Sequence, residues 1–107
     1  MKNIGELMMK AQKVQSQMNI LQTKMESQEF EGVAGNGAVK VVMTGHGTPV
    51  KVSIDKSVVS SDDVETLEDL VMVALSDARN KIDGYMAQEM ERIQKSLGLP
   101  PGFKMPF

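Results

Sequence analysis

The sequence predicts an α+β fold of one long N-terminal helix, a three-stranded antiparallel sheet and one long C-terminal helix, in a chain of 107 residues. Apolar residues recur at helical spacing at both ends of the chain. Three short β-branched runs, separated by glycine-rich turn signals, lie between them. We therefore expect a single domain over 1–107, with a Pro-rich C-terminal tail over 98–107.

The first helix is predicted from Ile4 to Met25. Its apolar residues alternate spacings of three and four, which is the heptad pattern of a helix that packs along a second helix. They are Ile4, Leu7, Ala11, Val14, Met18, Leu21 and Met25. At 1.5 Å per residue this helix is about 35 Å long.

The segment from Glu29 to Asp55 has the shorter period of strands. The runs FEGV, AVKVVMT and PVKVSID predict a meander, and alternation in the third run predicts one packed face and one solvated face. Glycines flank Asn36 in segment 35–37 and His46 in segment 45–47. We expect these glycines to supply the positive φ angles of tight turns.

Two features of this segment resemble functional motifs. The glycine-rich stretch 32–40 resembles a phosphate loop, but Ala38 and Val39 occupy the positions where that loop needs Lys and then Ser or Thr. A hairpin turn is the better interpretation. His46 could act as a ligand or base, although no second His or Cys accompanies it, so an exposed turn residue is expected.

The second helix is predicted to begin in SSDDVETLEDL, with Ser60 or Ser61 as its cap. Apolar residues then recur at helical spacing as far as Leu97, for about 54 Å. Gly84 predicts a kink or a helix–helix contact, and Gly98 ends the helix. Carboxylates gather at its start and match the helix dipole, which explains them without a divalent metal. They are Asp62, Asp63, Glu65, Glu68 and Asp69.

The predicted lengths imply a partner. Strands of five to seven residues span roughly 20 Å, so both helices must extend beyond the sheet with their apolar stripes uncovered. A three-stranded sheet also has open edges, and a second copy of the chain is the simplest complement to both features. The sequence therefore predicts a homodimer with projecting helical arms.

Composition leaves little room for catalysis. The chain has no Cys and one His, which removes disulfides, thiolate metal sites and most nucleophilic chemistry. We expect no catalytic residue, no metal site and no cofactor, and an enzyme has the least support of the function classes. The sequence also contains no long apolar run or signal-peptide core, so we expect a cytoplasmic protein without a membrane partner.

Basic residues form two rows at helical spacing. One row is Lys10, Lys13, Gln17 and Lys24, and the other is Lys81, Gln88, Arg92 and Lys95. Each row can share one helix face and meet phosphate groups, although a solvated outer face of a helical bundle is the ordinary interpretation. The net charge of −2 is low for a nucleic-acid-binding domain.

Five stretches, read in order, resemble the YbaB/EbfC family of bacterial nucleoid-associated proteins over nearly the whole chain. They are LMMKAQKVQSQM, GNGAVKVVMTGHG, VSID, SSDDVETLEDLVMVALSDARNKI and LPPGFKMPF. The resemblance implies a tweezer-like dimer that binds double-stranded DNA in the nucleoid without catalysis, with roles in nucleoid organisation and gene regulation. Lys56 departs from the family pattern, because many relatives have Pro there; this change adds a charge and loosens the start of the second helix.

The family's DNA contacts are attributed to its first and last helices. Carried over to this sequence, the resemblance implies a set of seven basic residues: Lys10, Lys13, Lys24, Arg79, Lys81, Arg92 and Lys95. The alternative is a protein-interaction scaffold for replication or recombination-repair partners, with incidental DNA affinity. The acidic total charge favours that alternative, and reversing basic charges would separate the two.

The tail is expected to be extended, because Pro100, Pro101 and Pro106 are incompatible with helix. Phe103, Met105 and Phe107 could anchor it in a groove between helices, on the same or the other subunit. A disordered tail and a tail that docks on another protein are the alternatives.

Overall fold

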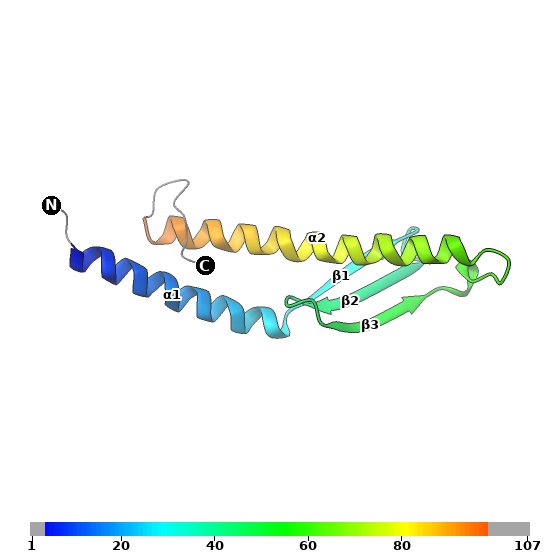
Figure 1. Ribbon diagram of the computed structural model, residues 1–107, viewed down its shortest axis with the longest axis horizontal. Coiled ribbons are helices and arrows are strands. Elements are labelled where there is room, and N and C mark those ends of the chain that lie inside the picture. The colour runs from blue at the N-terminus through cyan, green and yellow to red at the C-terminus, as the bar shows by residue number, and fades with distance from the viewer. Residues whose placement is uncertain (1–3, 99–107) are drawn as a thin grey trace.

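The computed structural model describes residues 4–98 and confirms the α+β fold (Figure 1). Its elements are α1 Ile4–Ser27, β1 Glu29–Ala34, β2 Val39–Thr44, β3 Pro49–Ile54, the 3-10 turn η1 Lys56–Val58 and α2 Val64–Ser96. The molecule is elongated, with principal-axis extents of 71 × 23 × 17 Å. The predicted anchoring of the tail falls on residues 99–107 and lies outside the described residues.

The three strands form one antiparallel sheet in the order β1-β2-β3. Val41 is paired with Gly32 on β1 and with Val52 on β3, and the register shifts between Val42 and Met43. α2 packs over β1 and β2 and buries their apolar face, which includes Phe30 and Val39. β3 lies at the open side of the sheet, and five of its six residues are exposed.

Small residues let α2 lie directly on β1. A Cβ added at Gly32 would overlap the carbonyl oxygen of Ala74 and lie 2.5 Å from the Ala78 nitrogen. Ala74 and Ala78 are themselves fully buried. This close approach of helix and strand backbones fixes the position of α2 on the sheet.

The turn glycines confirm the prediction at three positions and correct it at a fourth. Gly35, Gly37 and Gly47 have positive φ angles, and so does Asn36 at 57°. Gly45 does not. A Cβ at Gly45 would lie 2.8 Å from the carbonyl oxygen of Met25, so this glycine is required by the close approach of the β2–β3 turn to the backbone at the end of α1.

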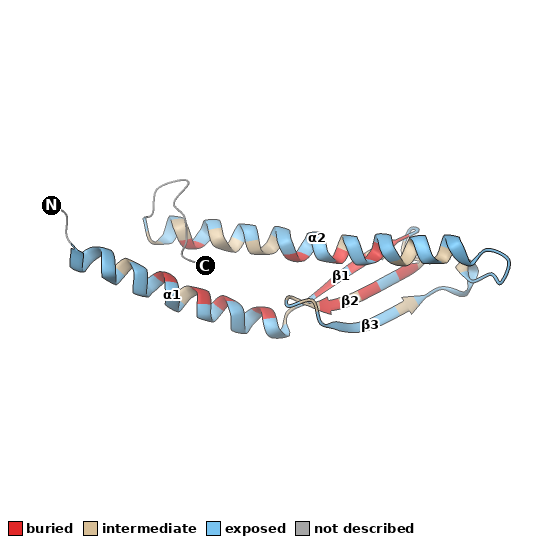
Figure 2. Ribbon diagram, in the orientation of Figure 1, coloured by how far each residue is buried: buried red, intermediate tan, exposed pale blue. Residues whose placement is uncertain are grey.

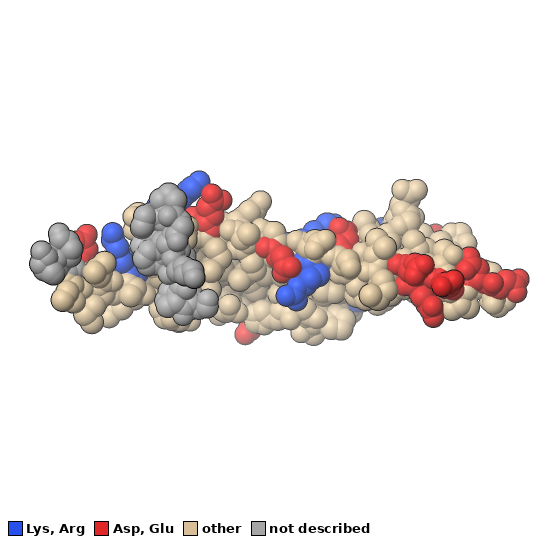
Figure 3. All heavy atoms as spheres, turned by 45° about the horizontal axis from the view of Figure 1, so that its top comes forward, with Lys and Arg blue, Asp and Glu red and all other residues tan. Residues whose placement is uncertain are grey.

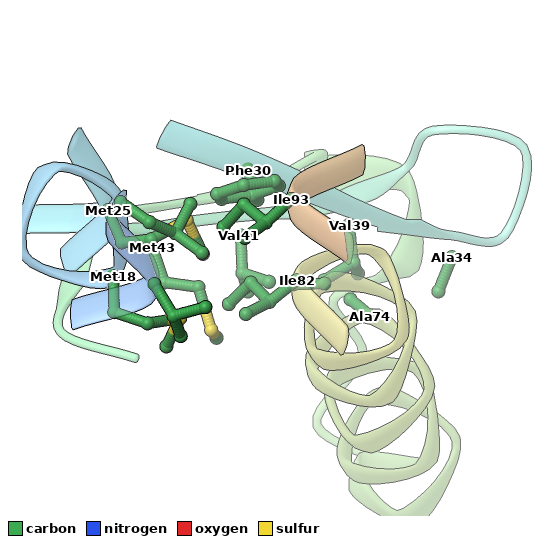
Figure 4. Close-up of a cluster of buried hydrophobic side chains, with 13 residues drawn as sticks. Met18, Met25, Phe30, Ala34, Val39, Val41, Met43, Ala74, Ile82 and Ile93 are labelled. Atoms are coloured by element: carbon green, nitrogen blue, oxygen red, sulfur yellow. The ribbon is translucent and has the colours of Figure 1, made fainter. Parts of the chain in front are cut away.

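Beyond the sheet, α1 and the second half of α2 form a two-helix arm. The heptad seam of α1 is buried at Val14, Met18, Leu21 and Met25, in one cluster with Ile82 and Ile93 of α2 and with the apolar face of the sheet (Figures 2 and 4). The seam residues Ile4 and Leu7 are 65% and 59% exposed. The N-terminal end of α1 projects past the end of α2 (Figure 1), which explains why its first seam residues are uncovered.

The ends of α2 differ partly from expectation. Neither Ser60 nor Ser61 caps the helix; Asp63 does, and it accepts hydrogen bonds from the Thr66 amide at 3.2 Å and the Thr66 hydroxyl at 2.6 Å. Residues 60–62 instead form a turn in which the Asp63 N–H donates to the Ser60 carbonyl. α2 continues through Gly84, where an added Cβ would meet nothing within 4 Å, so within residues 4–98 no close helix contact lies there. Gly98 has a φ of 69° just beyond the last turn, as predicted.

Candidate nucleic-acid interface

The seven predicted DNA contacts all lie on the two helices of the arm, but they are not equivalent. Lys10 and Lys13 lie towards the projecting end of α1. Among residues 4–98, no carboxylate is within ion-pair distance of either side chain. Their positive charges are therefore uncompensated within the described part of the chain.

Every basic residue of the predicted set on α2 is paired with a carboxylate three or four residues away. The pairs are Arg79–Asp83 at 3.2 Å, Lys81–Asp77 at 3.3 Å, Arg92–Glu89 at 2.9 Å and Lys95–Glu91 at 3.6 Å. The spacing of the basic residues alone predicted a cationic row, but the carboxylates one turn away offset its charge. α2 thus presents alternating charge rather than a positive stripe.

Lys24 connects the two helices of the arm. Its Nζ lies 5.2 Å from the centroid of the Tyr85 ring, and that ring in turn packs edge-on against Phe30. Hydrogen bonding to Tyr85 raises the pKa of Lys24, and the nearby Glu89 contributes in the same direction. Lys24 therefore joins α1 to α2 through a cation–π contact.

Lys81 and Arg79 lie on opposite flanks of α2. Lys81 donates to the Glu31 carbonyl at 2.7 Å, on the free edge of β1. Arg79 faces the other side, where it lines a pocket of about 410 Å³ with Gly45 and His46 of the β2–β3 turn. His46 is an exposed turn residue, as expected. The structure therefore separates Arg79 from Lys81, although both belong to the predicted set.

Acidic side chains gather at the end of the molecule that carries the start of α2 (Figure 3). Asp63 caps α2, and its hydrogen bonds from Thr66 lower the pKa of its carboxyl group. The Ser57 amide lowers the pKa of Asp55 in the same region. These carboxylates are ionised at neutral pH, so this end of the molecule repels phosphate groups. In the described part of the chain, no three His, Asp or Glu residues are grouped closely enough to hold a metal ion.

The predicted contacts leave out two features of the surface. Lys40 and Lys51 extend from the sheet face opposite α2, because their register partners Val33 and Val42 lie on that face. Strand alternation could have identified them. The second feature is a group of exposed apolar residues on β3 and α2, which we call the apolar trough: Val50, Val52, Ile54, Met72 and Leu75, all between 37% and 62% exposed.

The trough exists because α2 covers only part of the sheet. Val52 and Ile54 pair with the buried Val41 and Val39, so they extend from the same sheet face. α2 lies over β1 and β2 and leaves the apolar side of β3 open. Only the three-dimensional position of α2 reveals which residues of this face remain uncovered.

The YbaB/EbfC DNA-binding family model matches residues 1–97. The chain belongs to the YbaB/EbfC DNA-binding family. Nucleoid-associated proteins of Rhodospirillum centenum and Paramagnetospirillum magneticum are 44% and 46% identical to it, and each match covers 100% of both chains. An uncharacterized Helicobacter pylori protein has a similar fold, with a TM-score of 0.64, 22% identity and coverage of 75% of this chain and 93% of that one.

Family membership makes this YbaB/EbfC chain a nucleoid-associated DNA-binding protein of bacterial type. None of its helices in the described range is long and apolar enough to cross a membrane. Lys10 and Lys13, towards the projecting end of α1, are basic residues of the predicted set without an ion pair among residues 4–98.

Proposed function

We propose that the protein binds duplex DNA as a cytoplasmic homodimer, through phosphate contacts made by its helical arms, and so organises the nucleoid and influences gene expression. The observation that carries this proposal is the position of the half-buried Lys10 and the exposed Lys13 on the arm, without a carboxylate partner among the described residues. Salt-sensitive phosphate binding needs such uncompensated cations.

The two edges of the sheet support a specific dimer. At β1, the Val33 N–H donates to Asp77 at 3.0 Å and Lys81 binds the Glu31 carbonyl, so side chains of α2 occupy that edge. β3 is the opposite edge strand, and the apolar trough lies beside it. An antiparallel edge can pair with its own copy across a two-fold axis. We therefore place the dimer interface at β3 and the trough.

Dimerisation brings two arms to one DNA molecule. Two copies of Lys10 and Lys13 double the number of phosphate contacts, and two-point attachment raises the affinity further. The acidic start of α2 lies at the far end of the molecule from the projecting end of α1 (Figures 1 and 3) and disfavours DNA there. Charge therefore directs the duplex to the arms.

The test is a titration of random-sequence duplex DNA at several salt concentrations. We expect affinity to fall steeply between about 50 and 200 mM salt. The Lys10→Gln, Lys13→Gln double variant removes four charges per dimer and should flatten the slope of log affinity against log salt by roughly 3 to 4. Lys56→Gln is the matched control, because Lys56 is also exposed but lies beside the acidic end.

Equal slopes for the wild type and the double variant, with both dimers folded, would exclude the arm lysines as the DNA contacts. Absence of DNA binding at low salt would instead favour the protein-interaction scaffold for replication or recombination-repair partners.

A further inference from the structure

The face of α1 that points away from α2 has an unusual composition. At 3.6 residues per turn, six residues lie opposite the buried heptad seam and form what we call the outer face of α1. They are Met9, Gln12, Ser16, Asn19, Ile20 and Thr23, and all six are exposed. Four carry uncharged hydrogen-bonding groups and two are large and apolar.

This outer face lacks the carboxylates that a solvated helix face ordinarily carries. The sequence has no Asp or Glu between Glu6 and Glu26, whereas a paired carboxylate accompanies every predicted basic contact on α2. Lys13 lies four residues from Met9 and therefore borders the same face. A surface without negative charge beside Lys13, which has no ion pair among residues 4–98, is complementary to a polyanion.

Met9 and Ile20 are each 59% exposed, although both lie among polar residues. The heptad seam does not use them, because they lie on the opposite side of the helix from Val14 and Met18. Asn19 between them is held in place, since its Oδ1 accepts a hydrogen bond from Gln15 Nε2 at 3.1 Å. Its amide nitrogen remains available as a donor.

Amide side chains and apolar contacts are the groups that read base edges in the major groove. Asn and Gln bind adenine there, Ser and Thr bind several bases, and apolar side chains contact the thymine methyl group. An α-helix with its side chains is about 10–12 Å wide, which matches the major groove of about 12 Å and not the minor groove of about 6 Å.

We propose that the outer face of α1 enters the major groove and reads base edges, with Asn19 and Gln12 hydrogen-bonding to adenine and Ile20 and Met9 contacting thymine methyl groups. Lys13, which borders this face, holds an adjacent phosphate. This inference rests on the proposed DNA binding and adds sequence preference for sites that contain A·T pairs to it.

The first experiment is selection of bound sites from a randomised duplex pool by the full-length protein, followed by affinity measurements on the recovered site and a scrambled site. We expect the recovered site to bind about fivefold or more tightly than the scrambled one. Asn19→Ala and Ile20→Ala should lower affinity for the recovered site towards that for the scrambled site. Their affinity for the scrambled site should remain within about twofold of the wild type. Val73→Ala, an exposed apolar residue on α2, is the matched control.

Chemical changes in the DNA then locate the contact. Replacing thymine by deoxyuridine removes only the methyl group, and replacing adenine by 7-deazaadenine removes an acceptor of the major groove. We expect deoxyuridine to weaken binding by the wild type and to have no further effect on binding by Ile20→Ala. Likewise, 7-deazaadenine should weaken binding by the wild type and have no further effect on binding by Asn19→Ala.

Three outcomes would overturn the inference. The first is salt-sensitive binding without any preferred site in the selection. The second is an equal loss of affinity for the recovered and the scrambled site in Asn19→Ala. The third is a site preference that a minor-groove ligand removes, while the thymine and adenine replacements have no effect. In each case the phosphate-binding dimer would stand. Failure of the wild type to bind any duplex would instead overturn the proposed function itself.

Discussion

The carboxylate of Asp77 on α2 accepts a hydrogen bond from the backbone N–H of Val33 at 3.0 Å, on the outer edge of β1. A residue of the helix thus supplies the partner that a further strand would otherwise provide. The hydrogen bond from Val33 is the largest cause that lowers the pKa of Asp77, and Lys81 adds to it. This contact joins the register of α2 to the edge of the sheet.

Asp77→Asn should make folding less stable near neutral pH and reduce its loss of stability in acid. A carboxyl group whose pKa is lowered by folding stabilises the folded state when the pH is above its ordinary pKa of 3.8. This stabilisation is lost as the pH falls through the lower pKa of the folded state. Chemical unfolding from pH 7 to pH 2.5 would measure both effects. Asp83→Asn is the control, because Asp83 makes only an exposed ion pair, and it should change the profile less. Identical pH profiles for wild type and Asp77→Asn would contradict the assignment.

Gly32→Ala should destabilise the protein by about 1–3 kcal/mol or more. The added methyl group would overlap backbone atoms of Ala74 and Ala78, which cannot move without shifting α2 along the sheet. Urea unfolding measures the loss. A variant of unchanged stability would show that α2 does not lie this close to β1.

Gly84→Ala should have the opposite effect and stabilise the protein by about 1 kcal/mol, because Ala is the better residue within a helix. The position is open, with nothing within 4 Å of an added Cβ. Thermal unfolding of the variant gives the value. A marked destabilisation would reveal a partner backbone against this face of α2, which the single chain does not show.

Val52→Lys should convert the proposed dimer into monomers. The substitution places a charge in the apolar trough beside the β3 edge, and we expect the dimer dissociation constant to rise by at least about 100-fold. Analytical ultracentrifugation over a concentration series reports it. Val73→Lys provides the control, since Val73 is similarly exposed at 55% on another face of α2. A Val52→Lys dimer as tight as wild type would place the interface elsewhere.

Local patterns predicted the elements well, because each is encoded by neighbouring residues. The heptad spacing of α1 is confirmed by the burial of Val14 and Met18, and Gly35 and Gly37 take the positive φ angles expected of them. Gly45 was misread, since its role depends on Met25, which is close only in the folded chain. The cap was misplaced from Asp63 to the preceding serines because all are good capping residues and the turn before the helix decides between them.

The candidate site was less predictable, since charge depends on neighbours as well as on spacing. Arg92 and Lys95 formed a basic row in the sequence, yet Glu89 and Glu91 lie within ion-pair distance of them. Lys24 and Lys13 belong to the same basic row in the sequence, but in the folded chain Lys24 Nζ lies over the Tyr85 ring. The apolar trough could not be predicted, because it depends on which strands α2 leaves uncovered.

Because α1 projects past the end of α2, the stiffness of the arm differs along its length. Where both helices pack, from Val14 to Met25, the arm is a stiff double rod. Beyond Ala11, towards Ile4, α1 has no second helix packed beside it within residues 4–98, so this part bends under smaller forces. Lys10 lies in this compliant part. In the proposed dimer, the N-terminal ends of the two α1 helices can therefore change their separation while the packed core stays as it is. This lets the dimer bind duplex DNA that is locally bent, overwound or uneven in groove width.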